Sequence, residues 1–152
     1  MEADFSLVGR CGLYCGACAI YRAQRDDPER RTRLAKRFNC LEEEVCCEGC
    51  GALTETCWGS GCKLVLCLNE RGYRYCYECP QYAADTCEKF ARLAAGYRED
   101  GVDLRANLAV IQDGRVGEWL EESARRYSCP ECRNPLSLAA AVCPRCGRAI
   151  AR

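Results

Sequence analysis

The chain has 152 residues and carries 22 Lys and Arg against 22 Asp and Glu, so its formal net charge is zero. It contains 17 cysteines and no histidine, which excludes histidine acid–base catalysis, Ser–His and Cys–His nucleophile pairs, and zinc hydrolases with histidine ligands. Leu, Ile, Val and Phe supply only 27 residues, below the roughly one-fifth of a chain that builds a generous core, so we expect cross-links to stabilise the fold.

The cysteines are expected to bind metal rather than to form disulfides. Met1 to Arg10 has neither a long apolar run nor a cleavage-site pattern, and no stretch reaches the ~18 apolar residues of a membrane helix. We therefore predict a cytoplasmic protein with no membrane contact, in which thiols stay reduced. The odd number of cysteines also disfavours a closed set of disulfides.

The first cysteine motif is Cys11-Gly-Leu-Tyr-Cys15-Gly-Ala-Cys18. Radical enzymes hold a [4Fe–4S] cluster with this spacing, but they need a barrel of roughly 200 residues and glycine-rich cofactor contacts, which this chain lacks. The motif predicts metal ligands, with an iron–sulfur or redox protein using these cysteines as the alternative to zinc. If Ala17 starts a helix, Cys18 lies in its first turn, where the dipole favours a thiolate.

The segment that follows contains one clear helix and one candidate strand. Asp27-Pro28 supplies a cap followed by Pro at the first helical position, which predicts a helix to about Phe38. Residues 71–77 alternate with period two and place three tyrosines on one face of a predicted strand. We interpret that face as aromatic cover over a metal site rather than a stacking platform for bases.

Further cysteine pairs follow at ligand-like spacing. They are Cys47/Cys50, Cys62/Cys67 and Cys76/Cys79, with Cys87 after them. Because the cost of loop closure grows with loop length, we expect Cys47/Cys50 to share a site with Cys62/Cys67. Cys15/Cys18 would then join Cys76/Cys79, with Cys11 and Cys87 completing a third site or replacing a ligand. The remaining thiols are predicted to be idle, with accessory ligation or redox sensitivity as the alternative: Cys40, Cys46 and Cys57.

The stretch from Glu88 to Ser128 has no cysteine and shows helical periodicity. Asp85-Thr86-Cys87-Glu88 resembles a capping box that opens a helix, which Gly96 to Gly101 should break. Asp103 is expected to cap a second helix, and a third is expected over Glu118 to Tyr127.

The strongest signal lies at the end of the sequence. Cys129-Pro-Glu-Cys132 and Cys143-Pro-Arg-Cys146 are two knuckles separated by ten residues. Tetrahedral zinc takes two such pairs, and the short connection can fold into a hairpin that unites them. The pattern predicts a zinc ribbon, although the same four thiolates can hold iron.

Together these patterns predict an α+β fold in three parts. A small metal-stapled, cysteine-rich domain with short helices and little sheet covers 1–95, a helical connector covers 96–127, and the zinc ribbon covers 128–152. Each zinc ion bound by four thiolates adds a net charge of −2, which opposes nucleic-acid binding.

The ordered motifs from Cys11 to Cys79, with Cys87-Glu-Lys-Phe, resemble the cysteine-rich domain-of-unknown-function family 3795 over roughly Gly9 to Leu93. Asn107-Leu-Ala-Val-Ile, Gly117-Glu-Trp-Leu and the ribbon resemble its longer members. Where that family commonly has Ile-Arg inside the Cys62/Cys67 pair, this chain has Leu64-Val65. The resemblance implies zinc binding and no established activity.

We therefore predict a non-enzymatic metalloprotein that serves as an interaction or adaptor module for an unidentified protein partner. Nucleic-acid binding through Arg133, Arg145 and Arg148 of the ribbon ranks last. The sequence leaves the oligomeric state open. Several zinc sites are expected, with these ligands: Cys11, Cys15, Cys18, Cys47, Cys50, Cys62, Cys67, Cys76, Cys79, Cys87, Cys129, Cys132, Cys143 and Cys146.

Overall fold

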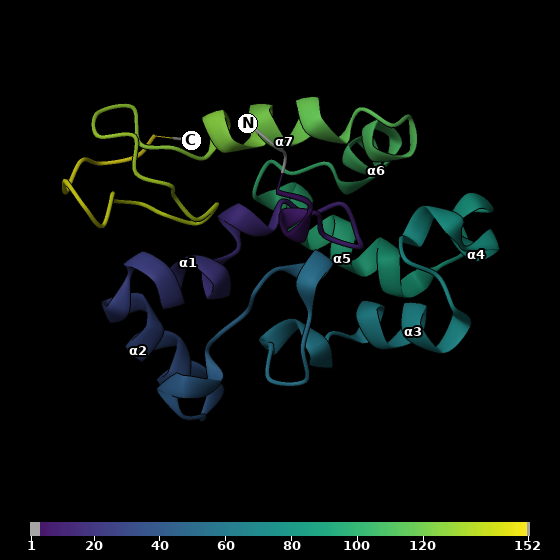
Figure 1. Ribbon diagram of the computed structural model, residues 1–152, viewed down its shortest axis with the longest axis horizontal. Coiled ribbons are helices and arrows are strands. Elements are labelled where there is room, and N and C mark those ends of the chain that lie inside the picture. The colour runs from purple at the N-terminus through teal and green to yellow at the C-terminus, as the bar shows by residue number, and fades with distance from the viewer. Residues whose placement is uncertain (1–3, 152) are drawn as a thin grey trace.

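The computed structural model describes residues 4–151, and this part of the chain is mostly helical (Figure 1). The ribbon lies at one end of the molecule above α1 and α2, while α3 and α4 lie at the opposite end (Figure 1). Short 3₁₀ helices connect the α-helices in the front half. The α-helices are α1 (Ala19–Asp26), α2 (Pro28–Phe38), α3 (Lys63–Arg71), α4 (Pro80–Ala83), α5 (Glu88–Glu99), α6 (Leu104–Gln112) and α7 (Val116–Arg126).

The predicted α+β class is not confirmed, because extended pairing within residues 4–151 is limited to isolated bridges such as Val8 with Tyr14. The strand predicted over 71–77 is wrong. Gly72 ends α3 in the left-handed conformation at φ 77°, and the Glu78 carboxylate then accepts hydrogen bonds from the backbone N–H groups of Arg74 (2.6 Å) and Tyr75 (3.1 Å). This capping folds the segment into a turn before the 3₁₀ helix Cys76–Glu78.

Two helix starts are confirmed with their caps. The side chain of Asp27 accepts a hydrogen bond from the Arg30 N–H at 3.0 Å, directly before Pro28. Asp103 does the same for α6, accepting from the Ala106 N–H at 3.0 Å. Each oxygen satisfies one of the amide donors that a helix leaves free at its first turn.

Other helix boundaries differ from the prediction. Asp85 has φ 57°, and its N–H donates to Tyr82 O at 3.0 Å, so it closes the turn after α4 instead of opening α5. The N-cap of α5 is Cys87, whose sulfur accepts from the Phe90 N–H at 3.5 Å. Cys18 is likewise the N-cap of α1 rather than a residue of its first turn.

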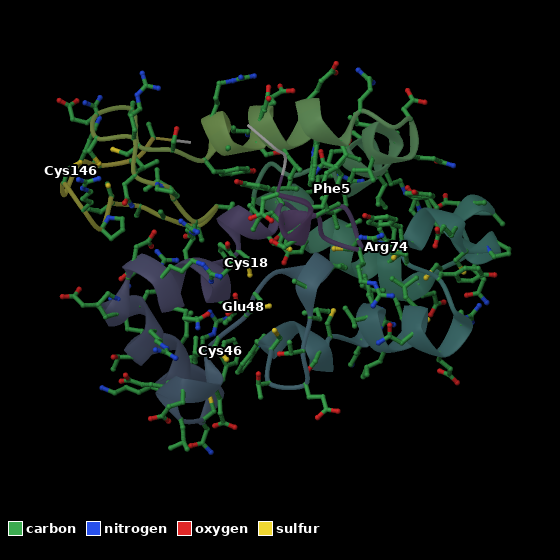
Figure 2. All side chains as sticks on the ribbon, viewed as in Figure 1. Phe5, Cys18, Cys46, Glu48, Arg74 and Cys146 are labelled. Carbon is green, nitrogen blue, oxygen red and sulfur yellow. The ribbon has the colours of Figure 1, made fainter. Side chains whose placement is uncertain are left out.

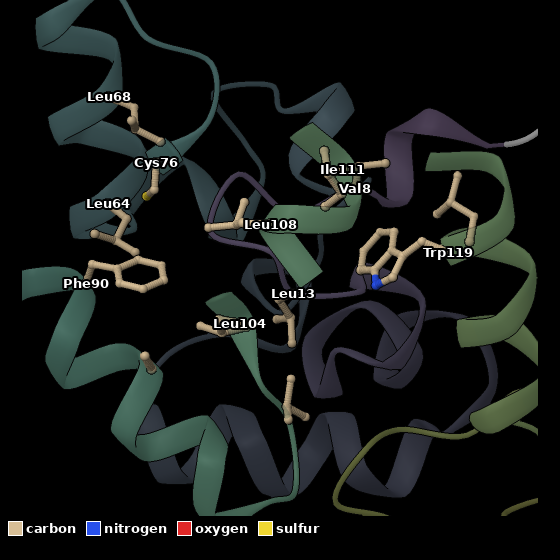
Figure 3. Packing of buried hydrophobic residues seen from close by; sticks show 13 residues of the cluster. Val8, Leu13, Leu64, Leu68, Cys76, Phe90, Leu104, Leu108, Ile111 and Trp119 are labelled. Atoms are coloured by element: carbon tan, nitrogen blue, oxygen red, sulfur yellow. The ribbon is translucent and has the colours of Figure 1, made fainter. Parts of the chain in front are cut away.

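The main hydrophobic core joins the front domain to the later helices (Figure 3). Phe90, Leu104 and Leu108 are fully buried at its centre, and Trp119 of α7 packs at one side. Cys76 belongs to the same cluster. A small number of aliphatic residues is therefore enough to build one continuous core, because α3, α5, α6 and α7 all direct their apolar faces into the same cluster.

The Asp103 cap gives a direct test of helix stability. Replacing it in Asp103→Ala is expected to lower the free energy of unfolding by about 1 kcal/mol, since a first-turn amide loses its acceptor. Urea unfolding measures this change. Asp113→Ala, at the exposed C-terminal end of the same helix, should cost nothing, because a negative charge there opposes the helix dipole. Equal losses in the two variants would contradict the assignment.

Candidate metal centre

Two copies of one backbone motif form the ribbon. In the first, the Cys129 N–H donates to Asn134 O at 2.9 Å and the Arg133 N–H donates to Cys129 O at 2.9 Å. The second repeats both bonds from Cys143, with Arg148 O as acceptor at 2.8 Å and Gly147 N–H as donor at 3.0 Å. In both copies the residue after the second cysteine is left-handed, at φ 65° for Arg133 and φ 76° for Gly147. The two knuckles are thus geometrically equivalent.

The knuckles face each other and bring four sulfurs together. The Sγ atoms of Cys129, Cys132, Cys143 and Cys146 all lie within 4.8 Å of one another. Cys129 Sγ lies 3.6 Å from Cys146 Sγ, and Cys132 Sγ lies 3.6 Å from Cys143 Sγ. Each close pair takes one cysteine from each knuckle, which is the arrangement that a central ion requires. Within residues 4–151, no other group of three or more potential ligand side chains has its ligand atoms this close together.

Backbone amides at the site favour the charged form of Cys129. At Cys146 the Arg148 N–H lowers the pKa, but burial and hydrogen bonds with the neighbouring thiols outweigh it and raise that pKa to about 12. The N–H groups of Cys132 and then Glu131 hold the pKa of Cys129 at about 6, against burial, which raises it. The thiolate is therefore stabilised by fixed donors in a turn that the Cys-Pro-x-Cys sequence imposes. On the outside of the ribbon, Arg148 Nη1 pairs with a Glu131 carboxylate oxygen at 2.6 Å and links the two knuckles.

Backbone hydrogen bonds attach the ribbon to the rest of the chain. The Leu136 N–H donates to Tyr127 O at 2.8 Å, and the Leu138 N–H donates to Ala17 O at 2.9 Å. The ribbon's own core is small, with Cys129, Leu136, Ala140 and Cys143 as its buried members. Two of these four residues are candidate metal ligands, so the apolar contribution to ribbon stability is slight.

The Cys11 motif lies close to Cys50, and Cys11 also interacts electrostatically with Cys76. The Cys50 N–H donates to Cys15 Sγ at 3.3 Å. Gly49, directly before Cys50, has φ 96° and packs against Ser6, where a Cβ would meet Ser6 O at 2.2 Å. Hydrogen bonding from Cys15 lowers the pKa of Cys50 to about 7, and burial raises the pKa of Cys11.

The second half of the front domain groups its cysteines differently from the predicted partition. Cys67 lines one small cavity with Cys76, Cys79 and Cys87, whereas the predicted partition joined it to Cys47 and Cys50. Cys62 is the exposed N-cap of α3. The spacing of Cys62 and Cys67 did not predict that the two residues would have different neighbours. Cys62 lies at the start of α3 and Cys67 lies more than one turn later, so their side chains point in different directions.

Cys57 has a defined environment that the sequence did not indicate. It is buried beside Cys47, and its sulfur accepts hydrogen bonds from the N–H groups of Glu48 and Thr54, both at 3.4 Å. Cys46 instead donates its thiol to Thr56 O at 3.3 Å. Figure 2 shows Cys46 and Cys18 well away from Cys146 of the ribbon.

All 17 cysteines are free thiols in this structure. Within residues 4–151, every helix is too short or too polar to cross a bilayer.

Comparisons with known proteins identify one family and no individual relative. No curated protein and no solved structure matches the chain. One family model, described as protein of unknown function (DUF3795), matches residues 7–92. This match includes every candidate ligand from Cys11 to Cys87 and confirms the resemblance seen in the motifs, while the ribbon agrees with the longer form of the family. The chain is therefore a member of the DUF3795 family, with a C-terminal four-cysteine cluster in addition to the family domain.

Proposed function

We propose that the protein binds zinc and that the ribbon holds one structural zinc ion. The observation that carries this proposal is the convergence of Cys129, Cys132, Cys143 and Cys146. Tetrahedral zinc with Zn–S bonds of about 2.3 Å places its sulfurs about 3.8 Å apart. The 3.6 Å separations between the knuckles already approach that value.

Zinc suits this site better than a redox metal. Four thiolates satisfy zinc completely, and a closed site of this kind serves structure rather than catalysis. The bound ion would cross-link the two knuckles, while the amides at Cys132 and Glu131 stabilise the Cys129 thiolate. Iron in the same four thiolates would give a coloured, redox-active protein, so colour and elemental content separate the two metals.

Native mass spectrometry combined with elemental analysis tests the ribbon site. Full-length protein purified without added metal is expected to contain zinc. Cys143→Ser should contain one equivalent less, because a ligand is lost from a closed four-coordinate site. Cys40→Ser, at a thiol outside the predicted ligand set, should keep the wild-type content. Retention of all zinc by Cys143→Ser, or iron in place of zinc, would contradict the proposal.

We propose further that the protein acts in the cytoplasm as a non-enzymatic module that binds another protein rather than nucleic acid. Support comes from charge: Arg148 of the ribbon is paired with Glu131, and each four-thiolate zinc site adds two negative charges. Filter binding with nucleic acid at low salt, where phosphate attraction is strongest, should show no retention. Salt-dependent retention would contradict this role.

A further inference from the structure

Four cysteines of the front domain line one cavity, although they come from three separate parts of the chain. Cys67 lies on α3, Cys76 and Cys79 bracket the 3₁₀ helix Cys76–Glu78, and Cys87 caps α5. The Cys79 N–H donates to Cys76 O at 3.1 Å, so the pair forms one tight turn. Figure 3 shows Cys76 of this group beside Leu64, Leu68 and Phe90, on an otherwise apolar wall.

The size of the cavity limits what it can hold. Its volume is about 20 Å³, which corresponds to roughly one water-sized body. A single metal ion fits this space. The other walls are mainly carbon, from Leu64, Leu68, Tyr82 and Phe90. The cysteine sulfurs are therefore the groups in this cavity that could bind an ion, and soft thiolates select ions such as zinc.

Two groups with positive character contact the sulfurs of the cavity: the exposed Arg71 guanidinium and the N-terminus of α5. Arg71 Nη1 donates to Cys79 Sγ at 3.8 Å, and the same guanidinium interacts electrostatically with Cys67. In the first turn of α5, the Phe90 N–H donates to Cys87 Sγ at 3.5 Å. Four thiolates around a divalent ion carry a charge of −2, and one guanidinium together with a helix N-terminus offsets part of that charge.

We propose that Cys67, Cys76, Cys79 and Cys87 form a second tetrathiolate site for one zinc ion, with Arg71 as a hydrogen-bond donor to the bound sulfurs. This inference extends the proposed zinc binding to the front domain and uses ligands entirely separate from those of the ribbon. Within residues 4–151, only the ribbon sulfurs all lie within 4.8 Å of one another. Metal binding at the second site therefore includes side-chain rotation that draws its four sulfurs inward.

The first test counts zinc ions in full-length variants by native mass spectrometry. Cys76→Ser and Cys132→Ser should each lose one zinc, and the double variant should lose two, while Cys40→Ser loses none. If Cys132→Ser alone keeps all its zinc, the ribbon proposal fails and the second site stands. If folded Cys76→Ser keeps the wild-type count, the second site is overturned. A coloured iron–sulfur cluster that disappears in Cys76→Ser would also overturn it.

The second test leaves the ligands intact, so it does not depend on a variant that folds. Wild-type protein is treated with increasing chelator and a thiol-alkylating reagent, and the modified cysteines are mapped by mass spectrometry. Cys67, Cys76, Cys79 and Cys87 should become reactive together as one zinc ion leaves. Reaction of Cys67 with Cys47 and Cys50 instead, or independent reaction of the four thiols, would contradict the grouping.

Arg71 is tested as a positioning residue. Arg71→Gln should retain the zinc count but release the front-domain zinc at about 10-fold lower chelator concentration, because it removes a donor to the bound sulfurs. Arg71→Lys, which keeps the charge, should restore part of that affinity. Release from the ribbon should be unchanged in both variants. An unchanged front-domain affinity in Arg71→Gln would exclude this role for the guanidinium.

Discussion

Cys132→Ser is expected to unfold the ribbon and to leave the helices of the front domain intact. Without its ion, the ribbon's own core keeps only Leu136 and Ala140 as buried apolar residues that are not ligands. Structural zinc in finger peptides contributes about 10–16 kcal/mol of apparent binding free energy, which such a small core cannot replace. The ribbon is attached to the body by backbone bonds, including Leu138 N–H to Ala17 O, and Leu138 packs only at the edge of the main core as a partly buried residue, so loss of the ribbon should not disrupt that core.

Limited proteolysis with mass mapping measures this outcome. Cuts in Cys132→Ser should fall within residues 128–152, and the fragment before them should remain resistant. Cys46→Ser, which removes a thiol that only donates to Thr56 O, serves as the matched control and should retain the wild-type pattern. Digestion of the entire Cys132→Ser chain would show that the ribbon and the body unfold as one cooperative unit.

The second large effect is expected at the centre of the main core. Phe90 is 0 % exposed, and its ring meets Tyr82 edge to face at 4.8 Å. Phe90→Ala should lower the free energy of unfolding by about 3–5 kcal/mol, because it removes buried area and leaves a cavity. That loss is a large part of the about 5–15 kcal/mol by which domains are stable.

Urea unfolding of the zinc-loaded protein measures this loss. Both variants are compared at the same zinc content, because a difference in metal bound by the front-domain cysteines would also change the free energy of unfolding. Phe38→Ala is the matched control: Phe38 is 45 % exposed and packs on Trp58 at 4.9 Å. Phe38→Ala should lower the free energy of unfolding by less than about 1.5 kcal/mol, because the Phe38 side chain buries little area on folding. Similar losses for Phe90→Ala and Phe38→Ala would contradict the assignment of the core.

The ribbon and the capped helices could be predicted because their signals are local. The sequence Cys-Pro-x-Cys followed by a residue able to adopt positive φ specifies a knuckle within a few residues, and two knuckles leave one way to converge. Asp27 and Asp103 act in the same way, since each cap bonds an amide three residues ahead. No distant contact was needed for either inference.

The grouping of the front-domain cysteines depends on tertiary packing, which spacing does not report. Cys67 meets Cys76, Cys79 and Cys87 because α3 and α5 pack on one core, and loop length alone favoured a different partner. The strand at 71–77 failed for a related reason: alternating tyrosines had no neighbouring strand, while Glu78 supplied local acceptors. Arg71 was detectable in principle, since it stands one helical turn after Cys67.

The melting curve of the full-length protein, followed by circular dichroism before and after complete removal of zinc, tests most directly whether thiolate-bound ions hold this fold. Removal should lower the melting temperature and the helical signal together, and added zinc should restore both, because ligands bound only by the folded state stabilise it. A protein shown by elemental analysis to be free of metal, yet melting as the zinc-loaded protein does, would contradict the account.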